Sequence, residues 1–285
     1  MSHTPVLLQE ILAGLNLRSG QTIVDCTFGG GGHAAALARQ VRQVLAFDRD
    51  PNAPNYAADI LAANPNIKLV PDNFSRLAEY IIAPVDGFVF DLGVSSFHLD
   101  LPERGFSWRQ DCALDMRMDT RQALTAEKIV NQYAEKELAD IIYNYGEEKY
   151  SRRIAKNILA ARQKNKITTS AQLKEIILRS VSGNYTAKNI SLARVFQALR
   201  IAVNDELNIL AGALTQAADL LKTGGRLAVI SFHSLEDRIV KNVFRDLQQK
   251  NILTLLAKKP LRPSAVEIQN NPRARSAKLR LGEKK

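Results

Sequence analysis

The sequence predicts an α/β fold in which a mostly parallel sheet is interrupted by an inserted all-helical domain. Short apolar strands alternate with helical stretches in the first part of the chain, an order typical of parallel sheets. From about residue 109 to residue 207 only the helical spacing of apolar residues remains, and the alternation then resumes. We therefore expect a discontinuous sheet domain at 1–108 and 208–285, ending in a basic C-terminal tail, and a helical domain at 109–207.

The composition is that of a globular protein. Of 285 residues, 46% are hydrophobic and 24% are charged, which allows a sizeable core. No apolar run approaches the ~18 residues of a membrane-spanning helix, and the start of the chain does not resemble a signal peptide. Cys26 and Cys112 are too few for a disulfide framework or a cysteine zinc site. We expect a cytoplasmic protein with no membrane partner.

The net charge of +10 is concentrated in two segments. Residues 258–285 contain nine basic and two acidic residues, and residues 149–166 contain seven basic residues and no acid. A local excess of positive charge points to a polyanionic partner, most simply nucleic acid. A basic surface that is merely solvated is the alternative.

The elements can be placed in chain order. A first helix should follow Thr4 and Pro5 and end near Gly14. The strands are expected at 22–25, 44–48, 67–71, 87–91 and 226–232. A helix then starts at Ser234, where residues 234–237 resemble a capping box.

Three of these strands end in a carboxylate, supplied by Asp25, Asp48 and Asp91. Open α/β sheets bind ligands at the carboxyl ends of their strands, so these acids are candidate site residues. Asp48 is placed to accept both hydroxyls of a cofactor ribose. Phe74, after the third strand, could pack on an adenine face or belong to the core.

A run of four glycines follows the first strand. Gly29 to Gly32, with His33 and Ala34, satisfy the dinucleotide-binding fingerprint and supply free amides at a helix N-terminus. Such a loop suits a nicotinamide-dependent dehydrogenase or an S-adenosylmethionine-dependent enzyme. Asp25 favours S-adenosylmethionine, because a carboxylate attracts its cationic amino group and repels a diphosphate. The helix before the first strand favours it as well.

The turn after the fourth strand, from Asp91 to Ser96, is expected beside the reactive end of the cofactor. Asp91 could accept a hydrogen bond from a substrate amine, or it could only cap the turn. Amino-methyltransferases often have two prolines here, and their absence weakens DNA as the substrate. His33 and His98 are interpreted as cofactor or substrate contacts. No histidine pair has the helical spacing of metal ligands, so no metal is expected.

Long segments of the chain resemble one family. They run in order and comprise HTPV at 3–6, DCTFGGGGH at 25–33, FDRDP at 47–51, DLGVSSFHLD at 91–100, RGFSW at 104–108, LDMRMD at 114–119, YGEEKYSRRIA at 145–155, RVFQALRIAVNDEL at 194–207, GGRLAVISFHSLEDRIVK at 224–241 and NPRARSAKLR at 271–280. On these segments the chain is similar to the MraW family of ribosomal RNA small subunit methyltransferases H. The segments LDMRMD and SFHSLEDRIVK are far more specific than the glycine loop.

The resemblance implies a class I S-adenosylmethionine-dependent methyltransferase with a Rossmann-like sheet. It implies methylation of the N4 amine of a cytidine, conventionally cytidine 1402, in the decoding centre of 16S rRNA within the small ribosomal subunit. Monomer and homodimer both stay open. A non-enzymatic RNA-binding protein that has kept a cofactor fold is the rival interpretation.

Motif matching carries over the cofactor contacts, and charge and chemistry indicate the catalytic residue and the RNA contacts. The cofactor contacts would be Gly31, Gly32, His33, Asp48, Phe74, Asp91 and His98, with Asp91 as the catalytic residue. The residues expected to contact RNA are Arg104, Lys149, Arg152, Arg153, Lys156, Arg194, Arg200, His233, Arg273, Arg275, Lys278 and Arg280. The chain departs from the family pattern at Ala34, where Ser or Thr is usual, at Phe97-His98, and at 190–193, where His-Pro-Ala-Thr is usual.

Overall fold

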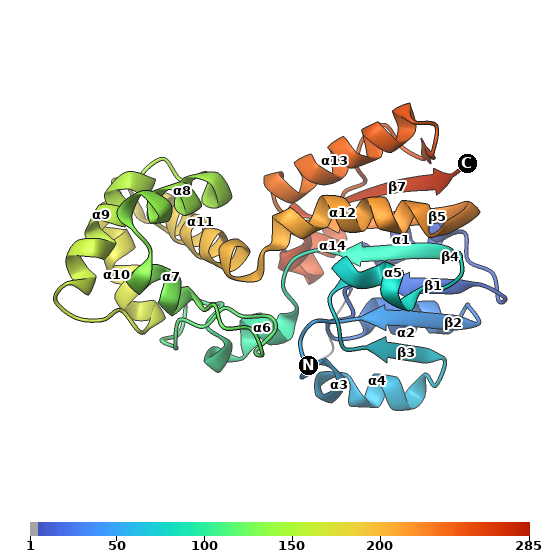
Figure 1. Cartoon of the computed structure of the whole chain (residues 1–285), viewed down its shortest axis with the longest axis horizontal. Coiled ribbons are helices and arrows are strands. Elements are labelled where there is room, and N and C mark those ends of the chain that lie inside the picture. The colour runs from blue at the N-terminus through green and yellow to red at the C-terminus, as the bar shows by residue number, and fades with distance from the viewer. Residues whose placement is uncertain (1–4) are drawn as a thin grey trace. The chain divides into compact units, whose positions relative to one another are not determined.

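The computed structural model describes residues 5–285, which fall into two compact units (Figure 1). The described part of unit 1 comprises 5–95 and 207–285, and unit 2 comprises 96–206. His3 and Thr4, at the start of the first matching segment, lie outside the described residues. Within residues 5–285, no helix combines the length and the apolar character needed to cross a bilayer.

The inserted unit ends within one residue of the expected boundary but begins at Ser96 rather than at residue 109. The segment between these positions packs inside the helical unit. Phe106 is buried there, and Trp108 lies against Phe196 with 5.4 Å between the ring centroids. Aromatic anchors of this kind do not show helical periodicity, so the spacing of apolar residues places the boundary too late.

Unit 1 holds a seven-stranded sheet with the order β3-β2-β1-β4-β5-β7-β6. Its strands are β1 (Thr22–Asp25), β2 (Gln43–Phe47), β3 (Ile67–Val70), β4 (Val85–Asp91), β5 (Leu221–Ser231), β6 (Leu253–Leu255) and β7 (Lys278–Lys284). Strands β1 to β5 pair in parallel, whereas β7 runs antiparallel to both β5 and β6. The five expected strands are confirmed, although β5 begins five residues earlier than expected, at Leu221 rather than residue 226.

The expected C-terminal tail is wrong, because residues 278–284 form the interior strand β7. In this strand Leu279 and Leu281 are buried and alternate with basic residues. Such alternation has the period of a half-buried strand, but the local density of lysine and arginine conceals it.

The two faces of the sheet carry separate apolar clusters, because successive side chains of a strand point to opposite faces. The helices of unit 1 are α1 (Leu8–Leu15), α2 (Gly32–Ala38), α3 (Ala53–Tyr56), α4 (Ala58–Ala63), η1 (Phe74–Arg76), α5 (Leu77–Tyr80), α12 (Glu206–Asp219), α13 (Ser234–Gln249), α14 (Ala265–Asn270) and η3 (Pro272–Ser276). Val89 of β4 packs with Ile11 of α1 and Leu37 of α2. Phe88 and Phe90 face the other cluster, which includes apolar residues of α5, α12 and α13.

Every named element of unit 2 is a helix. They are α6 (Ser96–Asp100), η2 (Pro102–Arg104), α7 (Ala126–Gln132), α8 (Glu135–Gly146), α9 (Ser151–Arg162), α10 (Ser170–Ser180) and α11 (Tyr185–Asn204). The end of α8 approaches α11 so closely that a Cβ atom at Gly146 would lie 2.6 Å from the carbonyl oxygen of Arg194. A glycine is therefore required where these two helices meet.

The start of α13 corrects the expected capping box by one residue. His233 is the cap, and its Nδ1 accepts a hydrogen bond from the Glu236 amide at 3.3 Å. The Glu236 carboxylate accepts in return from the amides of Phe232 and His233, at 2.8 and 3.3 Å. Both partners of the box thus lie one position before Ser234 and Asp237.

Asp237 does not cap α13. Its side chain instead connects α13 to β7. Its two carboxylate oxygens accept hydrogen bonds from Lys278 Nζ at 2.9 Å and Arg280 Nε at 2.8 Å. Burial alone would raise the pKa of Asp237, but the hydrogen bonds from Arg280 and Lys278 outweigh it and lower that pKa. A carboxylate with a lowered pKa stabilises the fold above the pKa of the unfolded chain, and this contribution is lost as the pH falls through the folded pKa.

Replacing Asp237 tests how much its hydrogen bonds with Lys278 and Arg280 contribute to stability. We expect Asp237→Asn to lower the free energy of unfolding at pH 7 by about 2 kcal/mol, because charge-assisted hydrogen bonds are lost. The difference from the unsubstituted protein should shrink below about pH 4. Asp246→Asn is the matched control on the same helix, because the Asp246–Lys250 pair is exposed and should contribute little. Equal losses in the free energy of unfolding for the two variants, measured by denaturant titration, would contradict a stabilising role of these hydrogen bonds.

Candidate active site

The carboxyl ends of β1 and β4 bring two predicted acids together. The strands are parallel neighbours in which Asp25 is aligned with Val89, two residues before Asp91. Thr27, two residues after Asp25, also links the two strands. Its Oγ1 accepts a hydrogen bond from the Asp91 amide at 2.7 Å. Thr27 was not among the expected site residues, because a hydroxyl that holds a neighbouring strand has no local sequence signal.

The glycine loop is held to the end of β2. The Gly29 amide donates to Asp48 Oδ2 at 2.7 Å, and Asp48 Oδ1 accepts from the Asp50 amide at 2.8 Å. Gly31 has φ +74°, and a Cβ atom there would lie 2.9 Å from Cζ of Phe28. The loop therefore needs glycine for its left-handed backbone and for its close packing. Gly32 is the first residue of α2.

Asp48 and Phe74 lie where a cofactor contact was expected, but both also have structural partners. Asp48 orders the glycine loop through the two amides just described. Phe74 is half-buried and meets Phe90 edge to face, with 5.5 Å between the ring centroids. Their roles toward ribose and adenine remain predictions.

His33 connects the N-terminal segment to the acids. Its Nε2 lies 3.0 Å from the carbonyl oxygen of Val6, and its Nδ1 lies 3.5 Å from Asp91 Oδ2. The imidazole is buried, and burial lowers the pKa of His33, against the opposing influence of the Asp25 charge and of the Val6 hydrogen bond. Val6 is a site residue that no sequence pattern indicated, because it acts through its backbone.

Burial raises the pKa values of both acids. Asp25 is 1% exposed, and its pKa rises to about 6, mainly by desolvation and despite the opposing influence of His33. The Asp91 side chain is 19% exposed, and its pKa rises to about 7, through desolvation and the nearby charge of Glu236. Both acids are thus poised close to neutral pH.

Each acid also has one oxygen that is left without a partner. Asp25 Oδ1 accepts from the Thr27 amide at 3.1 Å, but Asp25 Oδ2 is buried with no hydrogen-bond partner among residues 5–285. The same holds for Asp91 Oδ1. Buried polar atoms of folded proteins are almost always paired, so two orphaned acceptors beside a glycine loop fit a ligand that brings a cation and N–H donors.

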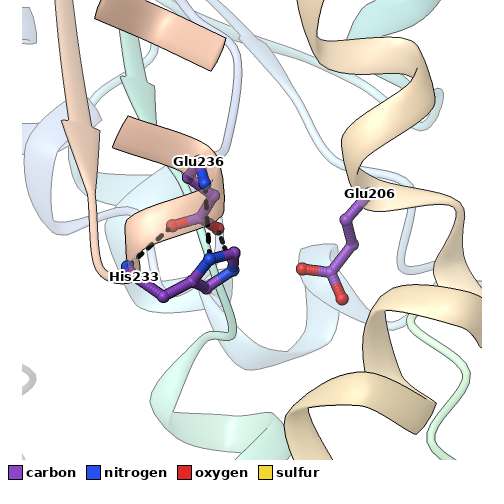
Figure 2. Close-up of side chains that lie close together, drawn as sticks. All are labelled: Glu206, His233 and Glu236. Carbon is purple, nitrogen blue, oxygen red and sulfur yellow. Dashed lines mark hydrogen bonds and ion pairs between the residues drawn. The ribbon is translucent and has the colours of Figure 1, made fainter. Parts of the chain in front are cut away.

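His233 and Glu236 pair at the start of α13, where Figure 2 shows the imidazole facing the carboxylate. The distance from His233 Nε2 to Glu236 Oε1 is 3.2 Å. Glu206, also drawn in Figure 2, is bound to Arg200 in unit 2 through two hydrogen bonds of 2.8 Å. Because each carboxylate already has a partner within its own unit, we assign no metal ligand to these residues.

His98 belongs to unit 2 and not to the sheet unit that carries the other expected cofactor contacts. It is buried and stacks on Phe106, with 5.0 Å between the ring centroids and 30° between the planes. This packing gives His98 a structural role within unit 2. Its contact with a cofactor remains a prediction.

Several residues expected to contact RNA are already engaged elsewhere. Arg104 is buried and donates from Nη2 to the carbonyl oxygens of Arg117 and Met118. Arg200 is held by Glu206, and His233 caps α13. Lys278 and Arg280 are bound by Asp237. Each of these five residues, Arg104, Arg200, His233, Lys278 and Arg280, thus has a structural partner, and its contact with RNA remains a prediction.

The remaining basic residues form two exposed groups, one in each unit. Unit 2 presents Lys149 together with Arg152, Arg153 and Lys156 of α9. Unit 1 presents Arg273 and Arg275 on η3. In unit 2, Lys149 and Arg153 both lie over the ring of Tyr150, at 4.9 and 4.8 Å from its centroid. An exposed face that combines cations with an aromatic ring suits nucleic acid.

A cavity of about 230 Å³ beside this group was not expected from the sequence. Its lining includes Lys149, Tyr150 and Arg194, together with the fully buried Glu148. Glu148 Oε1 accepts from the Tyr150 amide at 2.9 Å, and Glu148 Oε2 lies 3.8 Å from Nη1 of Arg194. The positive charge of Arg194 is thus partly balanced by the negative charge of Glu148. Glu148 lies directly before the basic segment 149–166, and a count of charges does not show that it is buried against Arg194.

Comparisons with known proteins show the family of the chain. A model described as the MraW methylase family matches residues 1–285. A Trichormus variabilis protein named ribosomal RNA small subunit methyltransferase H is 49% identical over 288 residues, covering 100% of this chain and 92% of that protein. A Carboxydothermus hydrogenoformans protein of the same name is 44% identical over 304 residues, covering 99% and 98%.

Among solved structures, a candidate rRNA methylase from Clostridium thermocellum has a TM-score of 0.50 and 16% identity, with 100% of both chains covered. At that identity the likeness concerns the fold alone. The family model and the two sequence relatives extend over essentially all of the chain. This protein is therefore a member of the MraW methylase family.

Proposed function

We propose that this protein transfers a methyl group from S-adenosylmethionine to the N4 amine of a cytidine in the 16S rRNA of the small ribosomal subunit. Family membership and the names of its relatives support a ribosomal RNA methyltransferase. The resemblance of the motifs supports the N4 atom and the nucleotide conventionally numbered cytidine 1402. We expect the enzyme to work in the cytoplasm, where small subunits are found.

The single observation that carries the proposal is the pair of buried, unpartnered oxygens on Asp25 and Asp91 beside the glycine loop. A dinucleotide diphosphate at this position would be repelled by the two acids. A cofactor with a cationic amino group and sulfonium would instead stabilise their ionised forms. This argues for S-adenosylmethionine and against the dehydrogenase alternative.

When bound, S-adenosylmethionine supplies an electrophilic methyl group whose bond to sulfur breaks as the N4–carbon bond forms, leaving a neutral thioether. The amine of cytosine is a poor nucleophile, so the protein must hold it in line, and positioning can supply several kcal/mol of the barrier. Asp91 Oδ1 has the free lone pairs to accept an N4 hydrogen and orient the amine. The methylated nitrogen then loses one proton, for which an acid of pKa about 7 is a suitable acceptor.

The target base must leave its stack to reach a pocket at the strand ends. We assign the RNA backbone to the exposed cations Lys149, Arg152, Arg153 and Lys156 of unit 2 and to Arg273 and Arg275 of unit 1. Phosphate contacts of this kind supply affinity and position without reading the sequence. We expect the groups around Asp91 to recognise the base.

A labelling experiment tests the proposal. Methyl-labelled S-adenosylmethionine is incubated with small subunits that lack the modification, with naked 16S rRNA and with DNA, and the nucleosides are separated after digestion. We expect label in N4-methylcytidine from the subunits. Label in another nucleoside, or only in DNA, would overturn the target. No label with any substrate, in a protein that binds the cofactor, would favour the non-catalytic RNA-binding alternative.

Asp91→Asn should abolish methyl transfer and yet stabilise the fold. An acid whose folded pKa is about 7 destabilises the folded state as the pH rises from about 4 to 7, because the folded state must give up a proton that the unfolded chain has already lost. The neutral amide avoids this, so we expect a gain on the order of 2 kcal/mol at pH 8 and none near pH 4. Denaturant titrations at both pH values measure it, and a loss of stability at pH 8 would contradict the raised pKa.

Cofactor binding should release protons. A cation beside Asp25 and Asp91 lowers pKa values that burial has raised to about 6 and 7, so affinity should increase between pH 6 and pH 8. Calorimetry at pH 6.5 in buffers of different ionisation enthalpy counts the protons. Asp91→Asn is the matched variant and should release fewer of them. Proton uptake, or an affinity independent of pH, would speak against cation binding at these acids.

A further inference from the structure

We propose that His33 is a positioning residue that sets the orientation of the Asp91 carboxylate, with the Val6 carbonyl fixing the imidazole. This inference rests on the proposed function and extends it, since motif matching gives His33 only as a cofactor contact. The geometry assigns the ring a second task, which is to hold one oxygen of Asp91 so that the other is presented to the substrate amine.

The first step is the state of the imidazole. A carbonyl oxygen can only accept, so the 3.0 Å contact with Val6 requires that His33 Nε2 carries a proton. Nδ1 is then either a bare acceptor or, in the imidazolium, a second donor. Because the ring is buried and its two nitrogens lie against the Val6 carbonyl and Asp91, it has little freedom to exchange these roles.

The second step is the asymmetry of Asp91. Its Oδ2 lies 3.5 Å from His33 Nδ1, whereas its Oδ1 is buried without a hydrogen-bond partner among residues 5–285. Two bare acceptors would repel each other, so His33 and Asp91 must share a proton for the contact to be attractive. At 3.5 Å the contact is longer than an ordinary hydrogen bond, and contacts of this kind commonly tighten when substrate is present.

Three further acids influence the charges of this pair and of its neighbour Asp25. Asp25 and Asp48 lie at the ends of β1 and β2, and Glu236 lies at the start of α13; all three are acids. The charge of His33 opposes this effect at Asp25, where it lowers the pKa of the carboxyl group. His33 is therefore in a position to compensate part of the crowded negative charge.

The third step is what anchors Val6. The next residue, Leu7, has a left-handed backbone with φ 52°, which is unfavourable for a branched side chain. Its amide donates to Glu267 Oε1 at 2.7 Å, so α14 holds the strained segment in place. Val6 and Leu7 are both buried in the core of unit 1. The chain of contacts thus runs from Glu267 through Leu7 and Val6 to His33 and ends at Asp91.

Two substitutions of His33 separate the two contacts of the ring. In His33→Gln the amide reaches the place of Nε2 and can still donate to Val6, but nothing replaces Nδ1. In His33→Asn the amide lies near the place of Nδ1 and can donate to Asp91, but the Val6 contact is lost. Both variants are compared with the unsubstituted protein in single-turnover methylation at saturating cofactor and in calorimetric binding of S-adenosylhomocysteine.

We expect His33→Gln to lower the single-turnover rate roughly a hundredfold, because misplacement of a reacting group by about 1 Å costs that much. His33→Asn should recover most of the rate that His33→Gln loses, and any loss of affinity for S-adenosylhomocysteine should be similar in the two variants, because both remove the imidazole. A rate loss that follows lost affinity would leave His33 a cofactor contact only, and equal rates in all three proteins would remove it from positioning. Either result overturns the inference, whereas an unsubstituted protein without methylation would instead overturn the proposed function.

A variant outside the site keeps the test decisive if either substitution of His33 disturbs folding. Glu267→Ala removes the acceptor for the Leu7 amide without touching His33 or Asp91. We expect a smaller fall in the single-turnover rate than in His33→Gln, with unchanged binding of S-adenosylhomocysteine. A normal rate in this variant would show that the anchored segment does not set the orientation of Asp91.

Discussion

Desolvation of neighbouring carboxylates is the constraint around which unit 1 is built. Asp25 and Asp91 end adjacent strands, so the sheet itself forces them together and away from water. Inside the protein a carboxylate loses far more hydration than a neutral acid, and this loss raises both pKa values. The fold tolerates this loss of hydration because the Thr27 hydroxyl and the hydrogen bonds of the parallel sheet hold the surrounding backbone in place.

The rest of the site follows from that constraint. The glycine loop has no side chains with which to cover the acids, and its first amide is already committed to Asp48. His33 supplies an imidazole next to Asp91, and the Val6 carbonyl, from a different part of the chain, fixes the position of its proton. The two buried acids destabilise the folded protein on their own, and a bound cation would stabilise their ionised forms. Such a loss of stability in favour of function is common.

Much of the sheet could be predicted because its signals are local. An apolar run that ends in an acid, as at Asp25 or Asp91, shows both the strand and the place of its carboxyl end. Contacts between distant segments have no such signal. Arg273 and Lys278 look alike in the sequence, yet one is exposed and the other is bound by Asp237 on α13. Partners such as Val6, Thr27 and Glu236 were missed for the same reason.

The long insertion also bears on how unit 1 reaches its folded state. Strands β4 and β5 are hydrogen-bonded neighbours, with Val89 aligned to Ala228, although the whole of unit 2 separates them along the chain. Pairing across such a distance carries a loop-closure entropy that slows folding. Helices of unit 2 make local contacts and can form early, which shortens the flexible length between the two strands. A substitution that weakens unit 2 would then delay assembly of the sheet without touching any residue in it.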